Sequence, residues 1–199
     1  MCQLFETIKI ENGQLKNLIF HNKRLNDARK FFFNCSDFID LKKIIKIPLL
    51  YKDNICKCKV LYSKVVEEII FDSYKKKHIT CLKLIIADDI EYSYKYKDRN
   101  QLETLFSKKG FYDDILIVKN KEITDTSFSN IVFYDGCKWF TPSNPLLKGT
   151  KRASLIERKK ITPEIITVKD LKLFKKASLI NAMLELGETT IENLSKTIQ

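Results

Sequence analysis

The stretch from residue 125 to residue 130 holds the side chains best suited to chemistry in this chain. It contains an acid, an amide and three small hydroxyl groups, in the residues Asp125, Asn130, Thr126, Ser127 and Ser129. Apolar runs of the kind found in covered strands flank it at residues 115–118 and 131–134. Small polar side chains held between two buried strands predict a binding or catalytic site.

A glycine before a predicted helix gives a second candidate site. Gly149 permits close backbone approach, and Thr150 can begin a helix that carries Ala153, Leu155 and Ile156. The first turn of a helix presents backbone N–H groups and the positive end of its dipole, which together attract phosphate. On its own this signal is weak, because most helix starts bind no ligand.

The elements expected around both sites form the second of two units. A strand is predicted at residues 78–87 and a short amphipathic helix at residues 100–108, followed by the strands on either side of the polar cluster. Asp135 and Gly136 predict the hairpin turn that follows. Alternation and apolar runs therefore place the polar cluster inside a sheet.

The chain before this unit predicts a smaller α/β domain. Its strands are expected at residues 5–10, 15–20, 56–62 and 66–71. Asn12-Gly13 predicts a tight hairpin turn, and a helical pattern begins at His21. The sequence thus predicts an α+β chain with one domain at residues 1–76 and a second at residues 77–199.

Composition limits the classes of protein. With 199 residues and 44% hydrophobic content, the chain can bury one sizeable core or two small ones. A net charge of +11 is compatible with nucleic-acid binding through phosphate neutralisation. The lysines are scattered and no nucleic-acid module is recognised, so a basic nucleic-acid-binding protein without catalysis ranks behind an enzyme.

Membrane and metal sites are not predicted. Apolar runs are too short for a membrane span, and Glu6 interrupts any signal peptide, which favours a cytoplasmic protein. The six cysteines form no CxxC module, and His21 and His78 are the two histidines of the chain, so no zinc or other metal site is expected.

The order of these features resembles the signature of the class IV aminotransferase family, the fold-type IV pyridoxal phosphate enzymes. The matching residues are Thr124-Asp125, Ser129-Asn130, Thr141-Pro142 and Leu147-Lys148-Gly149-Thr150-Lys151-Arg152. Further matches are Phe5 to Thr7, His21 to Leu25 and Leu179 to Met183. The resemblance implies a small N-terminal α/β domain and a C-terminal α/β pseudo-barrel domain that binds pyridoxal 5'-phosphate.

The resemblance also implies which residues contact this cofactor. They are Arg24, Asp125, Leu147, Gly149, Thr150 and Lys151. Asp125 would hold a proton on the pyridine nitrogen and make the ring an electron sink, and Leu147 would pack on the ring face. The phosphate would lie at the backbone N–H groups of Thr150 and Lys151, with Arg24 as its cation. The family usually has Glu in place of Asp125 and commonly has Thr in place of Lys151.

The lysine that the family bonds covalently to the cofactor matches Lys97. Family members tend to show Lys, three residues, a polar position and then Leu, which fits Lys97 followed by Asn100, Gln101 and Leu102. Lys95 is the alternative, because it lies on the same strand face two residues earlier. The lysine would also remove a proton from the substrate carbon that bears the amine.

Two kinds of reaction fit this resemblance. A 4-amino-4-deoxychorismate lyase would release pyruvate and 4-aminobenzoate for folate synthesis, whereas a class IV aminotransferase would act on branched-chain or D-amino acids. The run SLINAM, ending at Met183, resembles the lyase pattern, so the lyase is preferred and Asn181 is expected to contact the substrate.

The assembly expected from the resemblance is a homodimer whose partner subunit completes the site. Phe31, Phe32 and Phe33 form an aromatic run too long for one helix face to bury, so part of it is expected to pack on a second copy. The alternative is that all three fill the core of the first domain.

Overall fold

The computed structural model describes residues 2–198 and divides into two compact units. Unit 1 comprises Met1–Lys76 with Tyr94–Asp98, and unit 2 comprises Lys77–Ser93 with Arg99–Gln199. The predicted second domain contains residues 94–98, but the structure packs this segment with unit 1. The outermost residues of the two predicted domains, 1 and 199, lie outside the described range, and the division into two domains stays a prediction.

Unit 1 is built on an antiparallel sheet in the order β2-β1-β3-β4. Its strands are β1 (Leu4–Glu11), β2 (Gln14–Leu15), β3 (Cys56–Tyr62) and β4 (Val66–Ser73). Asn12 and Gly13 join the first two strands with positive φ angles of 51° and 66°, as the predicted tight turn requires. The return strand predicted at residues 15–20 is present as β2 but ends at Leu15, because Asn17 takes a left-handed conformation and a helix begins at Leu18.

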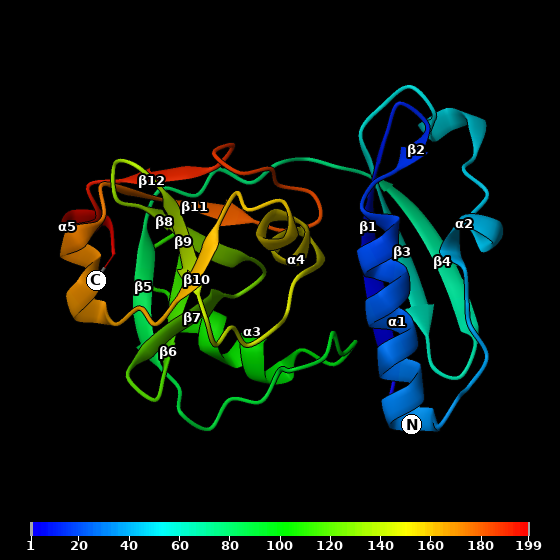
Figure 1. The fold of residues 1–199 in the computed structure, drawn as a ribbon, viewed down its shortest axis with the longest axis horizontal. Helices are drawn as coiled ribbons and strands as arrows, with labels where there is room; N and C mark the ends of the chain where they lie inside the picture. The colour runs from blue at the N-terminus through cyan, green and yellow to red at the C-terminus, as the bar shows by residue number, and fades with distance from the viewer. Residues whose placement is uncertain (1, 199) are drawn as a thin grey trace. The chain divides into compact units, whose positions relative to one another are not determined.

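Helix α1 (Leu18–Phe33) lies along β1 on one face of this sheet (Figure 1). Its buried residues Leu25 and Ala28 pack with Ile8 and Ile10 of the sheet. The helix ends at Asn34, where a left-handed residue turns the chain toward α2 (Leu41–Ile44) and η1 (Leu49–Tyr51).

The segment at residues 94–98 adds to the free edge of β1. Phe5 N donates to Lys95 O at 3.0 Å, and Lys97 N donates to Gln3 O at 2.8 Å. Tyr96 forms a bridge with Leu4 between these two hydrogen bonds. The backbone of Lys97 is therefore held by the first residues of the chain.

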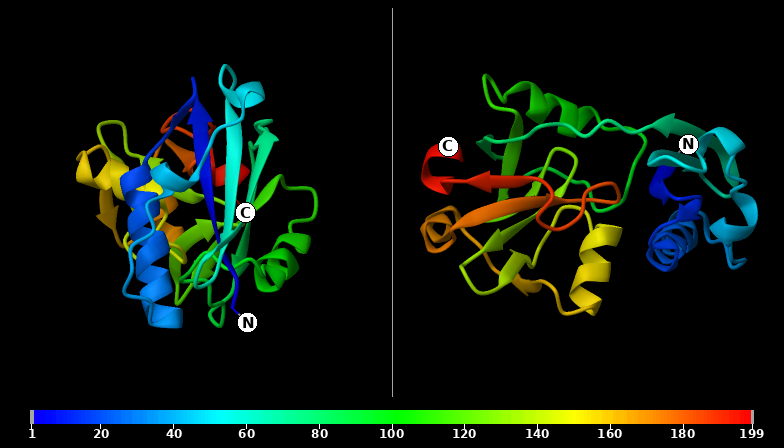
Figure 2. Two further views of the ribbon diagram at one scale, coloured as in Figure 1. Left: turned by 90° about the vertical axis from the view of Figure 1, so that its right-hand side faces the viewer. Right: turned by 90° about the horizontal axis from the view of Figure 1, so that it is seen from above.

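Unit 2 contains a mixed sheet in the order β10-β9-β8-β7-β6-β5, with β11 beside β8 and β12 beside β11. Its strands are β5 (Leu82–Ile86), β6 (Asp114–Lys119), β7 (Glu122–Thr126), β8 (Asn130–Tyr134), β9 (Trp139–Pro142), β10 (Thr162–Glu164), β11 (Lys176–Ile180) and β12 (Thr190–Glu192). Its helices are α3 (Asn100–Ser107), α4 (Thr150–Glu157), η2 (Val168–Leu173) and α5 (Leu194–Thr197). The strands curve into a half-barrel (Figures 1 and 2), and the predicted α+β class is confirmed.

The two apolar runs beside the polar cluster are covered strands, as predicted. Ile115, Leu116 and Ile117 of β6 and Ile131 and Val132 of β8 have no exposed surface. Strands covered on both faces need no polar alternation, which explains their continuous apolar sequence. The polar cluster thus lies where β7 ends and the buried strand β8 begins.

Candidate functional site

The polar cluster forms a tight connection between β7 and β8. Asp125 and Asn130 pair across the two strands, and Thr126 N donates to Ser129 O at 2.9 Å. The Thr126 hydroxyl also accepts from Ser129 N at 3.1 Å. These short-range hydrogen bonds fix Asp125 opposite Asn130.

Both oxygens of the Asp125 carboxylate accept hydrogen bonds. Oδ1 accepts from Asn130 Nδ2 at 2.7 Å, and Oδ2 accepts from Leu147 N at 2.8 Å. Asn130 Nδ2 also donates to Leu147 O at 2.9 Å. The strand pair and the loop before α4 are therefore cross-linked at one carboxylate.

Burial sets the electrostatics of Asp125. The residue is 5% exposed, and burial raises the pKa of its carboxyl group to about 6, although hydrogen bonds from Leu147 and Asn130 and the charge of Arg152 act in the opposite direction. A carboxylate with such a raised pKa gains stabilisation from any protonated group that binds beside it. Strongly shifted acids of this kind are common at functional sites.

The residue before α4 has to be glycine, because Asn130 leaves no room for a side chain at position 149. A Cβ on this residue would collide with Oδ1 of Asn130, whereas its φ of −65° suits any residue. The helix begins at Thr150 as predicted, and Ala153 N donates the first helical hydrogen bond to Gly149 O at 2.9 Å. The amides of Lys151 and Arg152 precede this hydrogen bond and belong to the positive end of the helix.

Two buried cations lie in the first turn of α4. Lys151 is 6% exposed, and its Nζ lies 2.6 Å from Oε1 of Glu185. Arg152 is 8% exposed and donates from Nη2 to Pro142 O at 2.8 Å, while its Nε has no hydrogen-bond partner within residues 2–198. The sequence did not predict the contact with Glu185, because 34 residues separate the two partners.

Asn181 connects the chain after β11 to the polar cluster. Its Oδ1 accepts from Met183 N at 2.8 Å and from Leu184 N at 3.0 Å, and its Nδ2 donates to Ser129 Oγ at 2.9 Å. These contacts shape the turn and fasten it beside Asn130. A contact between Asn181 and substrate stays a prediction.

Arg24 belongs to unit 1, where it pairs with a buried glutamate. Its Nε and Nη2 donate to the two oxygens of Glu6 at 2.8 and 2.5 Å, and Nδ1 of His21 lies 2.6 Å from Oε2 of Glu6. Burial alone would raise the pKa of Glu6, but the Arg24 charge and the hydrogen bonds from His21 and Arg24 lower it to about 2. Burial lowers the pKa of His21, although the hydrogen bond to Glu6 and the charge of Glu6 act in the opposite direction.

The sequence did not predict that Glu6 orients a candidate site residue. Its position on the buried face of an alternating strand was visible, but its partners follow 15 and 18 residues later on α1. A buried charged residue in such a strand is the signal that could have found it, because charges are rarely buried without a partner.

The two lysine candidates also belong to unit 1. Lys97 is exposed, whereas Lys95 is half-buried with its Nζ 4.6 Å from the centre of the Phe5 ring. The predicted site residues therefore divide between the units: Lys97 and Arg24 lie in unit 1, and the structure brings the others together in unit 2. The role of Lys97 stays a prediction.

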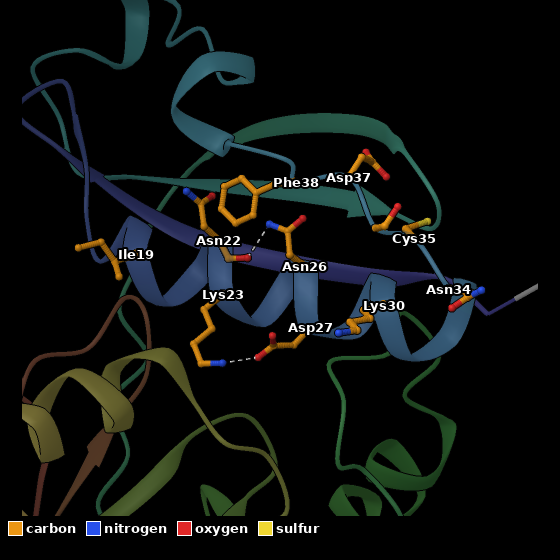
Figure 3. Close-up of a pocket in the computed structure, with 11 residues that line it drawn as sticks. Ile19, Asn22, Lys23, Asn26, Asp27, Lys30, Asn34, Cys35, Asp37 and Phe38 are labelled. Atoms are coloured by element: carbon orange, nitrogen blue, oxygen red, sulfur yellow. Dashed lines mark hydrogen bonds and ion pairs between the residues drawn. The ribbon is translucent and has the colours of Figure 1, made fainter.

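A surface groove of unit 1 contains none of the predicted site residues (Figure 3). It follows α1 and the loop at residues 34–38, and Lys23 pairs with Asp27 at 2.7 Å along its edge. Across residues 2–198, no group of three metal-ligating side chains occurs. In the same range, no helix is long and apolar enough to cross a membrane.

Comparisons with known proteins agree on one family. Residues 93–189 match the model of the amino-transferase class IV family. An uncharacterised protein of Haemophilus influenzae is 36% identical over 185 residues, which are 92% of this chain and 98% of the relative. The region matched by the family model begins just before Lys97 and includes all the predicted site residues of unit 2.

Solved structures extend the match to the whole fold. A protein from Haemophilus somnus, provisionally assigned as a 4-amino-4-deoxychorismate lyase, is 36% identical with a TM-score of 0.87, over 94% of this chain and 98% of that one. A hypothetical aminotransferase from Mycobacterium tuberculosis, in a form with bound pyridoxal phosphate, shares the fold at 14% identity and a TM-score of 0.76, over 99% of this chain and 81% of that one. The chain is an enzyme and belongs to the amino-transferase class IV family.

Proposed function

We propose that this chain is a pyridoxal-phosphate-dependent 4-amino-4-deoxychorismate lyase that releases pyruvate and 4-aminobenzoate for folate synthesis. The observation that carries the proposal is the buried Asp125 carboxylate, held by Asn130 and by Leu147 N, with a pKa of about 6. Support for the lyase reaction comes from the Haemophilus somnus relative and from the Asn181 motif.

The residues of unit 2 fit pyridoxal phosphate. Both oxygens of Asp125 accept hydrogen bonds from protein amides, and a carboxylate oxygen has lone pairs for more. Gly149 and the first turn of α4 offer backbone amides and a positive helix end to a phosphate. When bound, this cofactor supplies a protonated pyridine ring that withdraws charge from the reacting carbon.

The proposed tasks of the binding residues follow from their chemistry. Asp125 keeps a proton on the ring nitrogen, because a desolvated carboxylate is stabilised by a cationic N–H partner. Leu147 would pack against the cofactor ring, and Gly149, Thr150 and Lys151 would hold the phosphate. Arg24 adds a cation, and its orientation is fixed by Glu6.

Lys97 is the proposed catalytic residue. Its Nζ would hold the cofactor and would take the proton from the substrate carbon that bears the amine. Borohydride treatment of the cofactor-loaded protein followed by peptide mapping should place the adduct on Lys97. An adduct on Lys95, or none on either, would contradict this assignment.

The reaction itself is tested by its need for an acceptor. Cofactor-loaded protein is mixed with 4-amino-4-deoxychorismate, and pyruvate is measured through coupled reduction to lactate. Pyruvate release without any keto acid supports the lyase. Turnover that requires an added keto acid would instead identify a class IV aminotransferase for branched-chain or D-amino acids. Membership of an enzyme family removes the alternative of a nucleic-acid-binding protein without catalysis.

The proposed assembly is a cytoplasmic homodimer. Phe31 is 68% exposed, whereas Phe32 and Phe33 pack against the core of unit 1, so one ring of the predicted aromatic run is available to a second copy. Light scattering at micromolar concentration tests this, and a monomer that binds pyridoxal phosphate tightly would show that a partner is not needed.

A further inference from the structure

The ion pair between Lys151 and Glu185 is unusual in its position. Lys151 is the second residue of α4, where the positive end of the helix disfavours a cation. Its side chain is 8% exposed, while that of Glu185 is 49% exposed, and the two charges lie 2.6 Å apart. A nearly buried ammonium needs a counter-charge, and at this helix end the counter-charge has to offset the dipole as well.

Glu185 is carried by a short segment that also contacts the polar cluster. The segment follows β11, and Asn181 fastens its beginning to Ser129 at 2.9 Å. The backbone N of Glu185 donates to Oε2 of Glu188 at 3.0 Å, which orients the residue within the turn. The segment at residues 181–188 therefore joins α4, through Lys151, to the connection between β7 and β8.

We propose that Lys151 is an exchangeable cation, held by Glu185 until an anion binds at the start of α4. This inference rests on the proposed function, because the anion it names is the phosphate of pyridoxal phosphate. An incoming phosphate competes with Glu185 for the Lys151 ammonium, because both anions are attracted to the same cation. Glu185 thus weakens phosphate binding, and phosphate loosens the hold of α4 on the segment at residues 181–188.

The test is a double-mutant cycle with two probes. Pyridoxal phosphate and pyridoxal, which lacks the phosphate, are titrated into the wild type, Glu185→Gln, Lys151→Thr and the double variant, with absorbance as the readout. Glu157→Gln is the matched control, because it removes the same charge from the exposed far end of α4. Circular dichroism confirms that every variant is folded.

Glu185→Gln should bind pyridoxal phosphate about tenfold more tightly than the wild type, with unchanged affinity for pyridoxal. Lys151→Thr should bind pyridoxal phosphate several-fold more weakly, and in its background Glu185→Gln should bring no gain. Glu157→Gln should match the wild type. Unchanged or weaker binding of pyridoxal phosphate by Glu185→Gln would contradict the proposed exchange of Lys151. So would a gain in affinity from Glu185→Gln that persists in the double variant.

Two further measurements keep this test separate from the proposed function. If the wild type binds neither pyridoxal compound, the proposed function fails. Titration of inorganic phosphate into the same four proteins then tests the exchange by itself, and Glu185→Gln should again bind more tightly than the wild type and Lys151→Thr more weakly. Hydrogen exchange of the wild type supplies a readout without substitution. The amides of residues 185–188 should exchange faster in saturating phosphate, and unchanged or slower exchange would contradict the proposal.

Discussion

Two buried carboxylates, Glu6 in unit 1 and Asp125 in unit 2, have opposite electrostatic environments. Glu6 has no exposed surface and contacts the Arg24 guanidinium and the His21 ring. Asp125 is nearly as buried, but its direct donors are the neutral amides of Asn130 and Leu147. The pKa of Glu6 is lowered to about 2, whereas the pKa of Asp125 is raised to about 6.

The difference lies in the charge of the donors. A cation in direct contact outweighs the cost of burying a carboxylate, whereas neutral donors offset only part of it. Glu6 is therefore a fixed anion that holds other side chains in place. Burial destabilises the charged form of Asp125, and a protonated ligand atom beside the carboxylate would offset that cost. A site for a cationic cofactor atom needs this property.

Replacement of the Asp125 carboxylate should have the largest effect. Asp125→Asn should lower turnover on the order of a thousandfold, because a neutral amide cannot hold the proton on the ring nitrogen. Asp125→Glu, which restores the residue usual in the family, should retain most activity. Steady-state kinetics with cofactor-saturated protein measures both variants. Full activity in Asp125→Asn would show that turnover does not need the Asp125 carboxylate.

Replacement of the fixed anion should act mainly on stability. Glu6→Gln leaves Arg24 without its buried counter-charge and should lower the free energy of unfolding by about 3 to 4 kcal/mol. Urea denaturation at pH 7 measures this loss. Glu11→Gln, on the same strand but one third exposed, should cost less than about 1 kcal/mol. An equal loss of unfolding free energy in the two variants would show that the buried pair stabilises the fold no more than an exposed pair does.

The two carboxylates should also give opposite pH dependence. The folded pKa of Asp125 is raised above its ordinary value of 3.8, so the stability it contributes is present below about pH 4 and is lost as pH rises through about 6. The folded pKa of Glu6 is lowered, so the stability it contributes is present above its ordinary pKa of 4.5 and is lost as pH falls toward about 2. Each contribution should reach on the order of 3 kcal/mol at most.

Unfolding measurements across pH separate these two contributions. Asp125→Asn should remove the loss of stability between pH 4 and pH 6, and Glu6→Gln should remove the loss at lower pH. If the unfolding free energy of Asp125→Asn depends on pH as that of the wild type does, the pKa of Asp125 is not raised in the folded protein.

A smaller effect is expected where the surroundings of Asp125 are altered indirectly. Gly149→Ala places a methyl group against Oδ1 of Asn130, which must move away from Asp125, and should cost about 2 kcal/mol. Gly110→Ala meets no atom within 4 Å, although its φ of 59° makes it a strained position, and should cost about 1 kcal/mol. Denaturation would refute this prediction if Gly110→Ala proved the costlier change.

Local sequence signals predicted the elements that depend on local physics. The covered strands β6 and β8 follow from apolar runs, and the helix start at Thr150 follows from the glycine before it. The predicted strand at residues 78–87 is shorter, because the backbones of Thr80 and Cys81 donate to the side chain of Asp113 instead of extending the ladder.

Long-range pairs are what the sequence could not provide. Glu6 meets Arg24 and His21 only after α1 folds onto β1, and Lys151 meets Glu185 only after β11 joins the sheet. The sequence did place Asp125 in the candidate site through its motif. Its raised pKa depends on the burial and the neutral donors that the tertiary structure supplies.

The central claim is that Asp125 holds the proton of the cofactor ring nitrogen. Nuclear magnetic resonance of the protein loaded with pyridoxal phosphate labelled with ¹⁵N in the ring tests it directly, because the nitrogen shift reports protonation. At pH 7.5 the wild type should show a protonated ring nitrogen, and Asp125→Asn an unprotonated one. An unprotonated nitrogen in the wild type, or the same protonated signal in both proteins, would contradict the account.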